Sequence, residues 1–353
     1  MAKKIIVTGG AGFIGSNFIL KQINETANEI LNLDKLTYAG NLDNLASVAD
    51  HARYQFVEGD ITDKELVQSL VQGFQPDGIV HFAAESHVDR SIDGPMPFIM
   101  TNVVGTANLL DVTYRYWKDL EVARKADFRF LHVSTDEVFG SLGMDDVFKI
   151  DTPYDPSSPY SASKAGSDHL VRAWGRTFDF PVLITNCTNN YGPFQFPEKL
   201  IPLVTINALA GKELPIYGTG ENIRDWLHVE DHCDAIYSVF RDGKVGDTYL
   251  VGGEEEVTNL RVVQTICDVL DEIRPTASGK SYREQITFVA DRPGHDLRYA
   301  MDISKIRDEL GWRPSKDFAA GLKHTIEWYL ANEPWWRKLQ EKKIYEQQRL
   351  GTK

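Results

Sequence analysis

Two adjacent carboxylates follow an apolar stretch of the sequence. The run FRFLHVSTDEVFG, residues 128–140, is typical of a buried strand that ends at Asp136 and Glu137. Adjacent carboxyl groups in an enclosed site push each other's pKa values apart, so one can stay protonated near neutral pH. The pair could then serve as the acid and the base that an elimination of water requires. Both could face one substrate only if the backbone turns there. The alternative is a solvated polar turn.

Three glycines lie at a spacing of three where the first strand meets the first helix. Gly9, Gly12 and Gly15 in IIVTGGAGFIG permit a tight turn, and the helix N-terminus offers N–H donors to a pyrophosphate. The alternative is a glycine-rich turn that binds nothing. Asp34 ends the second strand, where a carboxylate can accept both adenosine-ribose hydroxyls and would repel a 2′-phosphate. A strand-terminal acid in a turn is the other interpretation. Together these residues predict NAD rather than NADP.

A tyrosine and a lysine four residues apart form a second reactive pair. Tyr160 and Lys164 in PYSASKAGSDHL share one face of a predicted helix. The lysine ammonium and an oxidised nicotinamide would both lower the tyrosine pKa from its usual value near 10. The phenolate could then accept a proton from a substrate hydroxyl as a hydride leaves. An ordinary surface pair is the alternative, and the upstream glycine loop favours the catalytic interpretation.

The elements that must position these residues alternate along the first half of the chain. Apolar stretches lie at 3–9, 29–34, 54–60, 78–84, 128–134 and 181–186, and helical patterns lie at 15–24, 63–74, 102–117 and 161–178. This alternation predicts an α/β fold with a doubly wound parallel sheet of Rossmann type. After residue 186 the pattern fades, which favours a smaller, mixed α/β substrate domain. Residues 247–253 look like one more strand that returns to the first domain.

Each of the two predicted domains is therefore formed by two separate segments of the chain. We expect an NAD-binding domain at 1–187 and 225–253, a substrate domain at 188–224 and 254–335, and a C-terminal tail at 336–353. Trp335 and Trp336 are expected to pack. His81 and His132, on apolar strands, are expected to be satisfied core residues.

The net charge and the cysteine content argue against several kinds of partner and site. The 353 residues carry a net charge of −13, whereas a nucleic acid or an anionic membrane would favour a basic surface. Three cysteines far apart, without metal spacing, indicate a reducing, cytoplasmic setting and no metal site. The start MAKKIIVTGG predicts a first strand rather than a signal peptide, and no apolar run approaches the length of a membrane span.

The motifs together resemble a known superfamily. TGGAGFIG, FAAESHVD, STDEVFG and YSASK, in this order, resemble the extended short-chain dehydrogenase/reductases. With NNYGPFQFPEKLIP, RDWLHVEDH and DRPGHDLRY, the chain is similar to the dTDP-glucose 4,6-dehydratase family from about Lys3 to Trp312. The resemblance implies bound NAD, dTDP-glucose as substrate and a homodimer formed through a four-helix bundle. The product, dTDP-4-keto-6-deoxyglucose, would feed rhamnose synthesis for cell-surface polysaccharide, or amino-sugar or antibiotic deoxysugar routes.

The resemblance also assigns roles in the reaction. Tyr160 would deprotonate the sugar 4-hydroxyl while the C4 hydride goes to NAD⁺, and Thr135 would hydrogen-bond that hydroxyl. Glu137 would take the C5 proton, Asp136 would protonate the departing 6-hydroxyl, and the hydride would return to C6. The implied catalytic residues are Thr135, Asp136, Glu137, Tyr160 and Lys164.

The implied binding residues come from both halves of the chain. The cofactor would contact Gly9, Gly12, Phe13, Ile14, Gly15, Asp34, Lys35, Leu36, Thr37, Asp60, Ile61, Ala83, Ala84, Glu85, Ser86, Thr101, Tyr160, Lys164 and Asn190. The glucosyl group would lie near Ser86, His87 and Thr135, and the diphosphate near Asn189 and Arg224. The nucleoside would contact Lys199, Leu200, Pro215, Ile216, Tyr217 and Asn259, with Asp291, Arg292, Pro293, Gly294 and His295 closing over it.

Rival functions remain on the same scaffold. A nucleotide-sugar 4-epimerase would use the same cofactor loop and tyrosine–lysine pair but would not need the acid pair. A GDP-mannose-type dehydratase would differ at the residue before Glu137 and in the base-binding loop. A non-catalytic NAD-binding regulatory protein would be expected to lose the tyrosine, the lysine or the acid. The carrier nucleotide, dTDP or UDP, is left open.

Overall fold

A seven-stranded parallel sheet organises the larger part of the molecule. The computed structural model describes residues 2–291 and 295–341. The sheet strands are β1 (Lys4–Thr8), β2 (Glu29–Asp34), β3 (Tyr54–Glu58), β4 (Gly78–His81), β5 (Arg129–Thr135), β6 (Val182–Cys187) and β10 (Thr248–Val251). They lie in the order β10-β6-β5-β4-β1-β2-β3, and every neighbouring pair is parallel. The predicted Rossmann-type sheet and the return of 247–253 are confirmed. We call this part the sheet domain.

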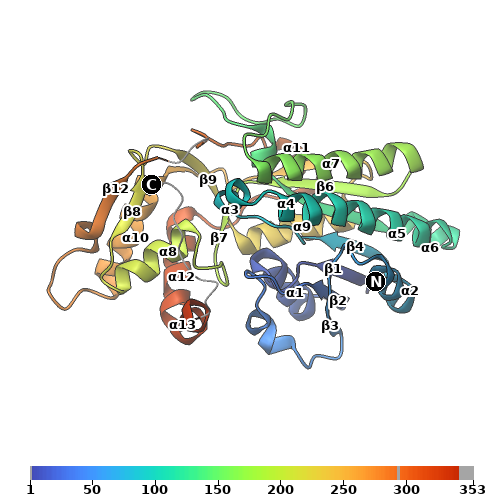
Figure 1. Ribbon diagram of the computed structural model, residues 1–353, viewed down its shortest axis with the longest axis horizontal. Helices are drawn as coiled ribbons and strands as arrows, with labels where there is room; N and C mark the ends of the chain where they lie inside the picture. The colour runs from blue at the N-terminus through green and yellow to red at the C-terminus, as the bar shows by residue number, and fades with distance from the viewer. Residues whose placement is uncertain (1, 292–294, 342–353) are drawn as a thin grey trace.

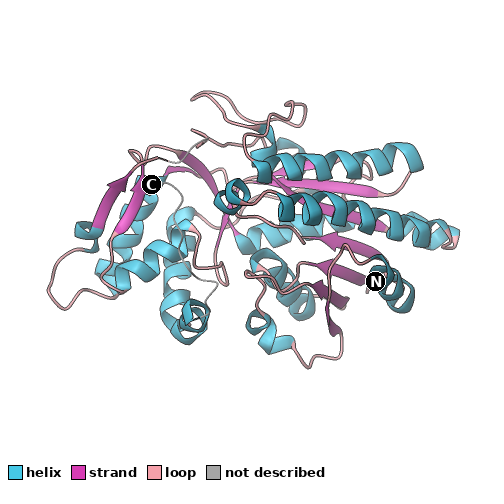
Figure 2. Ribbon diagram, viewed as in Figure 1, coloured by secondary structure: helices cyan, strands magenta, loops and turns pink. Residues whose placement is uncertain are grey.

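Helices cover both faces of the sheet (Figures 1 and 2). One face carries α2 (Lys64–Phe74), α5 (Thr106–Lys118) and α7 (Pro159–Phe178), which pack side by side. The other face carries α1 (Phe13–Glu25), α9 (Val229–Asp242) and α11 (Ser304–Leu310). Shorter elements connect them: η1 (Leu42–Val48), α3 (Val88–Asp93), α4 (Met96–Phe98), α6 (Val122–Asp127) and the 3₁₀ turn η3 (Asp136–Phe139).

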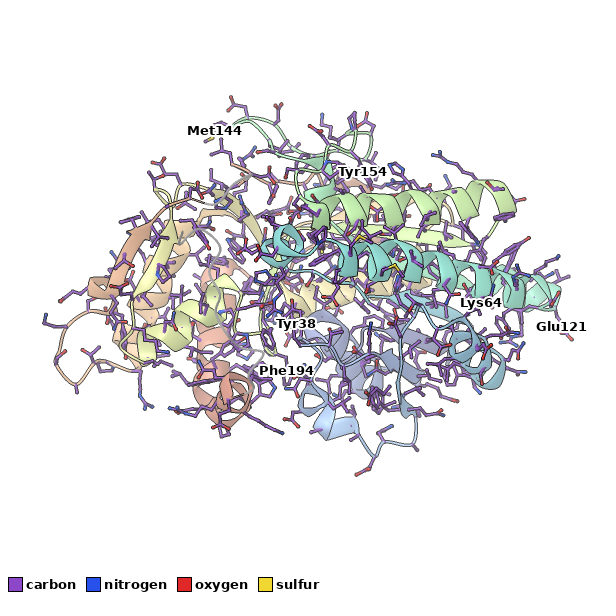
Figure 3. All side chains as sticks on the ribbon, viewed as in Figure 1. Tyr38, Lys64, Glu121, Met144, Tyr154 and Phe194 are labelled. Carbon is purple, nitrogen blue, oxygen red and sulfur yellow. The ribbon has the colours of Figure 1, made fainter. Side chains whose placement is uncertain are left out.

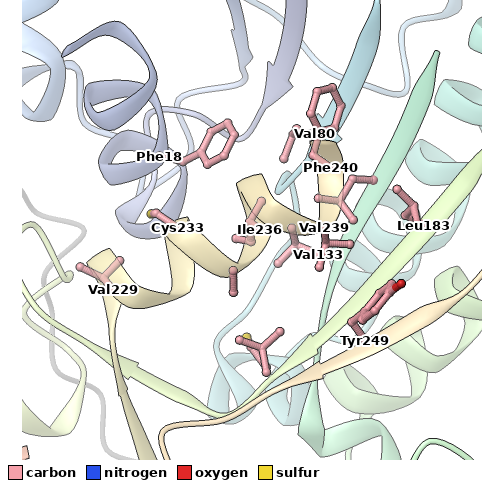
Figure 4. Packing of buried hydrophobic residues seen from close by; sticks show 14 of the residues in the cluster. Phe18, Val80, Val133, Leu183, Val229, Cys233, Ile236, Val239, Phe240 and Tyr249 are labelled. Carbon is pink, nitrogen blue, oxygen red and sulfur yellow. The ribbon is translucent and has the colours of Figure 1, made fainter. Parts of the chain in front are cut away.

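The core under α1 and α9 shows why the sequences of the strands are almost continuously apolar. Figure 4 shows Phe18 of α1 and Ile236 and Phe240 of α9 packed against Val80 of β4 and Val133 of β5. Because helices cover both faces, strand residues of either parity are buried. Each fully buried aliphatic or aromatic side chain contributes about 1.5–3 kcal/mol to folding.

Local signals set where α7 begins. Ser158 precedes it with a capping box, in which the Ser158 hydroxyl accepts a hydrogen bond from the Ser161 backbone at 3.0 Å. The Ser161 hydroxyl in turn accepts one from the Ser158 backbone at 3.0 Å. Pro159 occupies the first helical position, where its missing N–H costs nothing. These caps fix the start of the helix that carries Tyr160 and Lys164.

One helix begins differently from its pattern. Residues 102–117 were predicted as a single helix, but the chain enters α5 through a π-helix, η2 (Ile99–Gly105). A π-turn adds a residue to the helical turn and is frequent at functional sites. Its Asn102 is buried and ties the loop after β4 to α7, because it accepts from Glu85 N at 2.8 Å and donates to Ser163 Oγ at 2.8 Å.

The smaller part, which we call the second lobe, contains two small sheets. One has the order β11-β9-β7, formed by β7 (Asn189–Tyr191), β9 (Ile223–His228) and β11 (Glu256–Thr258); the other pairs β8 (Leu214–Tyr217) with β12 (Ile286–Val289). Its helical elements are α8 (Leu200–Leu209), α10 (Asn259–Ile273), η4 (Tyr282–Gln285), α12 (Phe318–Ala331) and α13 (Glu333–Glu341). Figure 1 shows this lobe beside the sheet domain.

Two details refine the predicted boundaries. Residues 225–228 belong to β9 and therefore pair within the second lobe, whereas α9 and β10 that follow belong to the sheet domain. Residues 336–341, expected to start the tail, complete α13; Trp336 is buried, and Trp335 Nε1 donates to Asn44 Oδ1 at 2.9 Å. The packing role expected for both tryptophans is confirmed. Within the described residues, no helix has the length and apolar character needed to span a bilayer.

Candidate active site

The glycine loop forms a tight turn at the carboxyl end of β1. Gly9 has φ +73°, and a Cβ there would lie 2.6 Å from Ala83 N. A Cβ on Gly15 would lie 2.3 Å from the Gly9 carbonyl oxygen, so helix α1 packs directly on the turn. Gly12 precedes α1 without a side-chain cap. The first turn of α1 thus presents backbone N–H groups to the cleft in front of it, as an anion site requires.

Asp34 joins this loop to the end of β2. Its Oδ2 accepts from Ala11 N at 2.9 Å and its Oδ1 accepts from Leu36 N at 2.8 Å. Burial raises the Asp34 pKa, and the two backbone hydrogen bonds act in the opposite direction. Each carboxylate oxygen keeps a further acceptor site. The carboxylate is therefore fixed in place and can still accept two ribose hydroxyls.

A single cleft brings most of the predicted residues together. It is lined by 18 of the 19 predicted cofactor residues: Gly9, Gly12, Phe13, Ile14, Gly15, Asp34, Lys35, Thr37, Asp60, Ile61, Ala83, Ala84, Glu85, Ser86, Thr101, Tyr160, Lys164 and Asn190. Leu36 contributes its backbone to Asp34 but does not line the cleft. Thr135, Asp136, Glu137, Asn189 and Lys199 line the same cleft. The cofactor loop and the acid pair thus share one space.

The acid pair lies on the turn that the sequence required. Residues 136–139 form η3 directly after β5, and Thr135 caps it by accepting from Glu137 N at 3.3 Å. The Thr135 hydroxyl donates to Asp136 Oδ1 at 3.0 Å. The 3₁₀ turn ends the alternation of a strand, so both acids reach the cleft.

The two acids differ in environment. Asp136 is 2% exposed, and its Oδ2 has no hydrogen-bond partner among the described residues. Burial, reinforced by the neighbouring Glu137 charge, raises the Asp136 pKa well above its usual value. Thr135 and Arg224 oppose this shift. The raised pKa favours the neutral form of Asp136, which can donate a proton, whereas the Glu137 side chain is only half-buried.

Tyr160 and Lys164 face the cleft from α7. Burial, then the Glu137 charge, raises the Tyr160 pKa well above its usual value, and a hydrogen bond with Thr135 opposes the rise. The Lys164 ammonium donates to the Val133 carbonyl at 2.9 Å. Burial lowers the Lys164 pKa. The lowering of the tyrosine pKa by the lysine and an oxidised nicotinamide stays a prediction.

Most of the other predicted substrate residues lie in the second lobe, whereas His87 lies in the sheet domain. Tyr217 of β8 lies near His295, with ring centroids 6.2 Å apart, and His295 Nδ1 lies 2.7 Å from Asp291 Oδ1. Arg224 of β9 is buried, donates to Asp296 O at 3.0 Å and stacks on Tyr299 at 4.3 Å. Pro215 and Ile216 lie on β8, Asn259 begins α10, Leu200 begins α8, and His87 caps α3. These residues do not line the cleft described above. The predicted Arg292, Pro293 and Gly294 lie outside the described residues.

Several residues that line the cleft escaped the sequence reasoning, and Glu198 is a charged one among them. Glu198 accepts from the Tyr38 hydroxyl at 3.0 Å and lies 3.5 Å from Arg90, whose guanidinium stacks on the Tyr38 ring at 3.7 Å. It also faces His87 at 3.6 Å. We call Tyr38, His87, Arg90 and Glu198 the Glu198 cluster; Figure 3 labels Tyr38 where the sheet domain meets the second lobe. The acid lies within the motif FPEKLIP, but its partners are 108 or more residues away, so no local pattern connects them.

Comparison with known proteins identifies the family. The family model described as GDP-mannose 4,6 dehydratase matches residues 6–325. The chain belongs to this family. Within the GDP-mannose 4,6 dehydratase family, it is 58% identical over 341 residues to a dTDP-glucose 4,6-dehydratase of Shigella flexneri, which covers 94% of each chain.

Solved structures agree. The fold matches a Bacillus anthracis dTDP-glucose 4,6-dehydratase in complex with NAD, with a TM-score of 0.85 and 44% identity over 96% of this chain and 100% of that one. It also matches a Streptomyces venezuelae dTDP-glucose 4,6-dehydratase with NAD bound, with a TM-score of 0.86 and 46% identity over 95% of this chain and 99% of that one. The resemblance drawn from the motifs is confirmed.

Proposed function

We propose that this protein is a dTDP-glucose 4,6-dehydratase, an NAD-dependent hydro-lyase. The observation that carries the proposal is a buried Asp136, its pKa raised by burial and by Glu137, in the same cleft as Tyr160 and the glycine loop. The relatives named above carry this activity in their names, at up to 58% identity. The reaction oxidises C4, removes water across C5 and C6, and reduces C6, giving dTDP-4-keto-6-deoxyglucose.

The residues of the cleft fit NAD. The first turn of α1 would hold the pyrophosphate, Asp34 the adenosine ribose, and Lys164 the ribose next to the nicotinamide. The cofactor supplies an acceptor that takes a hydride from C4 and later returns it to C6. Its positive ring would lower the Tyr160 pKa, as would the Lys164 ammonium, against the burial that raises it.

Each protein group then has one proton to move. Tyr160 accepts the 4-hydroxyl proton as the hydride leaves, and Thr135 orients that hydroxyl. The 4-keto group acidifies C5, so Glu137 can take the C5 proton, and C5 takes up a proton again when the hydride returns to C6. Asp136 donates its proton to the 6-hydroxyl, which leaves as water. The raised Asp136 pKa supports the donor role, because an ionised carboxylate could not perform it.

The acid pair separates this reaction from that of a 4-epimerase. An epimerase returns the hydride to C4 and has no leaving hydroxyl to protonate. Burying a second carboxyl group beside Glu137 is unfavourable, and its retention is explained by a reaction that needs an acid. A non-catalytic protein would need neither this acid nor a buried tyrosine facing the cofactor cleft.

We further infer a homodimer in the cytoplasm. Ile92, Met96, Met100 and Val104 are 43%, 62%, 47% and 41% exposed and recur every four residues from α3 through η2, beside α7. Such an apolar stripe next to a long helix suits a two-fold helix-to-helix interface. All three cysteines are buried and unpaired, which fits a reducing compartment.

The first test is turnover without added reductant. The NAD-loaded protein is incubated with dTDP-glucose, and alkali is added to develop the ultraviolet absorbance of a 4-keto sugar. We expect this absorbance to grow with time and to exceed that obtained with UDP-glucose. Its absence, with folded protein that carries NAD, would contradict the dehydratase assignment.

A second test separates oxidation from elimination. In single turnover, Glu137→Gln should oxidise C4 and then stop, so enzyme-bound NADH accumulates and solvent deuterium does not enter C5. Tyr160→Phe should slow the appearance of NADH itself. Rapid deuterium exchange at C5 in Glu137→Gln would assign the base to another group.

A further inference from the structure

A third ionisable residue continues the catalytic face of α7. Asp168 lies four residues after Lys164 and eight after Tyr160, so the three side chains share one side of the helix. Asp168 is fully buried at 0% exposure. It does not line the cleft, and the reaction as described above does not use it. A buried carboxylate away from the reacting atoms needs another explanation.

The Asp168 carboxylate binds the strands that end at the site. Its Oδ2 accepts from Ser134 Oγ at 2.9 Å, from Asn186 Nδ2 at 3.2 Å and from the Tyr154 hydroxyl at 2.7 Å. Ser134 lies on β5 one residue before Thr135, and Asn186 on β6 also donates to the Thr135 carbonyl at 3.0 Å. Figure 3 labels Tyr154, which lies in the loop that precedes α7. Asp168 therefore connects the helix with Tyr160 to the strand with the acids.

His132 stands between Asp168 and Lys164. Its Nε2 lies 3.2 Å from Asp168 Oδ1 and 3.5 Å from Lys164 Nζ. Its Nδ1 and the Asp168 Oδ1 have no hydrogen-bond partner among the described residues, and Ser167 Oγ lies 3.2 Å from the same Nε2. Burial, followed by the Lys164 charge, lowers the His132 pKa to about 4, so the ring is neutral. The expectation of a fully satisfied core histidine holds for His81, bonded at both nitrogens, but not for His132.

The charges around Lys164 can be assigned from each neighbouring element. From β5 it faces neutral His132 and the Val133 carbonyl. From β6 it faces Cys187, whose thiol pKa is raised by burial, so the thiol is protonated. From its own helix it faces Asp168, whose pKa is lowered because the bonds from His132 and the Lys164 charge outweigh burial. Beyond Asp168, Arg172 donates to the Tyr154 hydroxyl at 2.7 Å. Within the described part of the chain, Asp168 is thus the anion opposite the buried ammonium.

We propose that Asp168 is a positioning residue of this site: across His132 it keeps Lys164 protonated, and through Ser134 and Asn186 it holds the end of β5 where the acids begin. The effect on turnover rests on the proposed function, whereas the effect on Lys164 does not. A lysine in a buried site tends to lose its proton, and a nearby anion opposes this. Without Asp168, Lys164 would be neutral at a lower pH and would no longer offer a charge to the cofactor ribose or to the Tyr160 phenolate.

The test replaces the charge while keeping the shape. Asp168→Asn is isosteric, and Tyr154→Phe is the matched control, because it removes one hydrogen bond to the same carboxylate and no charge. We expect Asp168→Asn to lower the Lys164 pKa by about one unit or more, as the loss of a neighbouring opposite charge does. The alkaline limb of the kcat/KM profile should move to lower pH by the same amount, because the protonated lysine is lost earlier. Tyr154→Phe should leave that limb where it is.

Two measurements distinguish a failure of the proposed role of Asp168 from a failure of the proposed function. The Lys164 pKa is measured by NMR of ¹³C-labelled lysine in the NAD-loaded protein, with Lys164→Met identifying the signal. If the wild-type protein makes no 4-keto sugar, the proposed function fails while the NMR titration still decides the role of Asp168. A folded Asp168→Asn protein with an unchanged Lys164 pKa overturns the proposal.

A folding failure is also informative. If Asp168→Asn does not fold, the same substitution is made in the Lys164→Met background. The double variant should then fold, because removing both members of an opposed pair leaves no unpaired buried charge. A double variant that also fails to fold shows that Asp168 is needed for its hydrogen bonds alone and overturns the proposal.

Discussion

The buried acid Asp136 is expected to lower the stability of the folded protein while it serves catalysis. An unfolded aspartate titrates near pH 3.9, whereas folding raises the Asp136 pKa well above that value. Between these two pKa values the folded protein holds a proton that the unfolded chain has lost. Stability is therefore fully present below about pH 4 and falls as pH rises through the folded-state pKa, by up to about 1.4 kcal/mol per pH unit.

Asp136→Asn removes this penalty without changing the shape. If Asp136 stays protonated at pH 7, the penalty there reaches about 4 kcal/mol, which is the upper limit for the gain in the variant. With an unfolding entropy of about 2.1 cal/mol/K per residue, this corresponds to a rise in Tm of about 5 °C for 353 residues. The variant should also fail to protonate the leaving hydroxyl, so NADH accumulates after C4 oxidation.

The assay compares thermal or urea unfolding of the two proteins from pH 4 to pH 8. Near pH 4 the carboxyl group is neutral in the folded protein and about half ionised in the unfolded chain, so the two proteins should differ least there and this point serves as the internal control. The advantage of the variant should then grow with pH. A difference that stays flat across this range would refute the assignment of Asp136 as a neutral buried acid.

Three further predictions concern other parts of the molecule. Gly15→Ala should lose NAD binding in a fluorescence titration, because the added Cβ would lie 2.3 Å from the Gly9 carbonyl oxygen. The control is Gly73→Ala on α2, where an added Cβ has no atom within 4 Å. This control should keep NAD binding, and its free energy of unfolding in urea should rise by about 0.5–1 kcal/mol. Glu198→Gln should release NAD up to about fivefold faster in stopped flow, since partly exposed ion pairs contribute about 1 kcal/mol or less; an unchanged rate would mean that the Glu198 cluster does not retain the cofactor. Met100→Glu should yield a monomer in sedimentation analysis with unchanged secondary structure, and a persistent dimer would place the interface elsewhere.

The sequence predicted what depends on local spacing. The parallel sheet follows from apolar runs between helical patterns, and the turn at Asp136 follows from the need to end a strand there. The glycine loop was predictable because backbone sterics at Gly9 and Gly15 leave little choice of residue type. Apart from the contact of Gly9 with Ala83, these features depend on neighbours within a few residues of each other.

What the sequence could not predict depends on contacts between distant segments. Glu198 meets Tyr38 across 160 residues of chain, and no periodicity connects them. The contact of the Lys164 ammonium with the Val133 carbonyl was not predictable for a similar reason, since spacing on a helix does not show what another element places nearby. Asn102 in the π-helix at 99–105 bonds to the loop after β4 and to α7, and neither partner could be inferred from the local sequence.

The place of β10 in the sheet has a consequence for the biosynthesis of the protein. β10 pairs with β6, yet about 60 residues of the second lobe and α9 separate the two strands in the chain. At roughly 5–20 residues per second, a ribosome needs several seconds to make them. During that time the edge of β6 is open, and an open strand edge can pair with other chains. Substitutions that slow folding of the second lobe should therefore reduce the yield of newly made protein, even where the finished enzyme is unaffected.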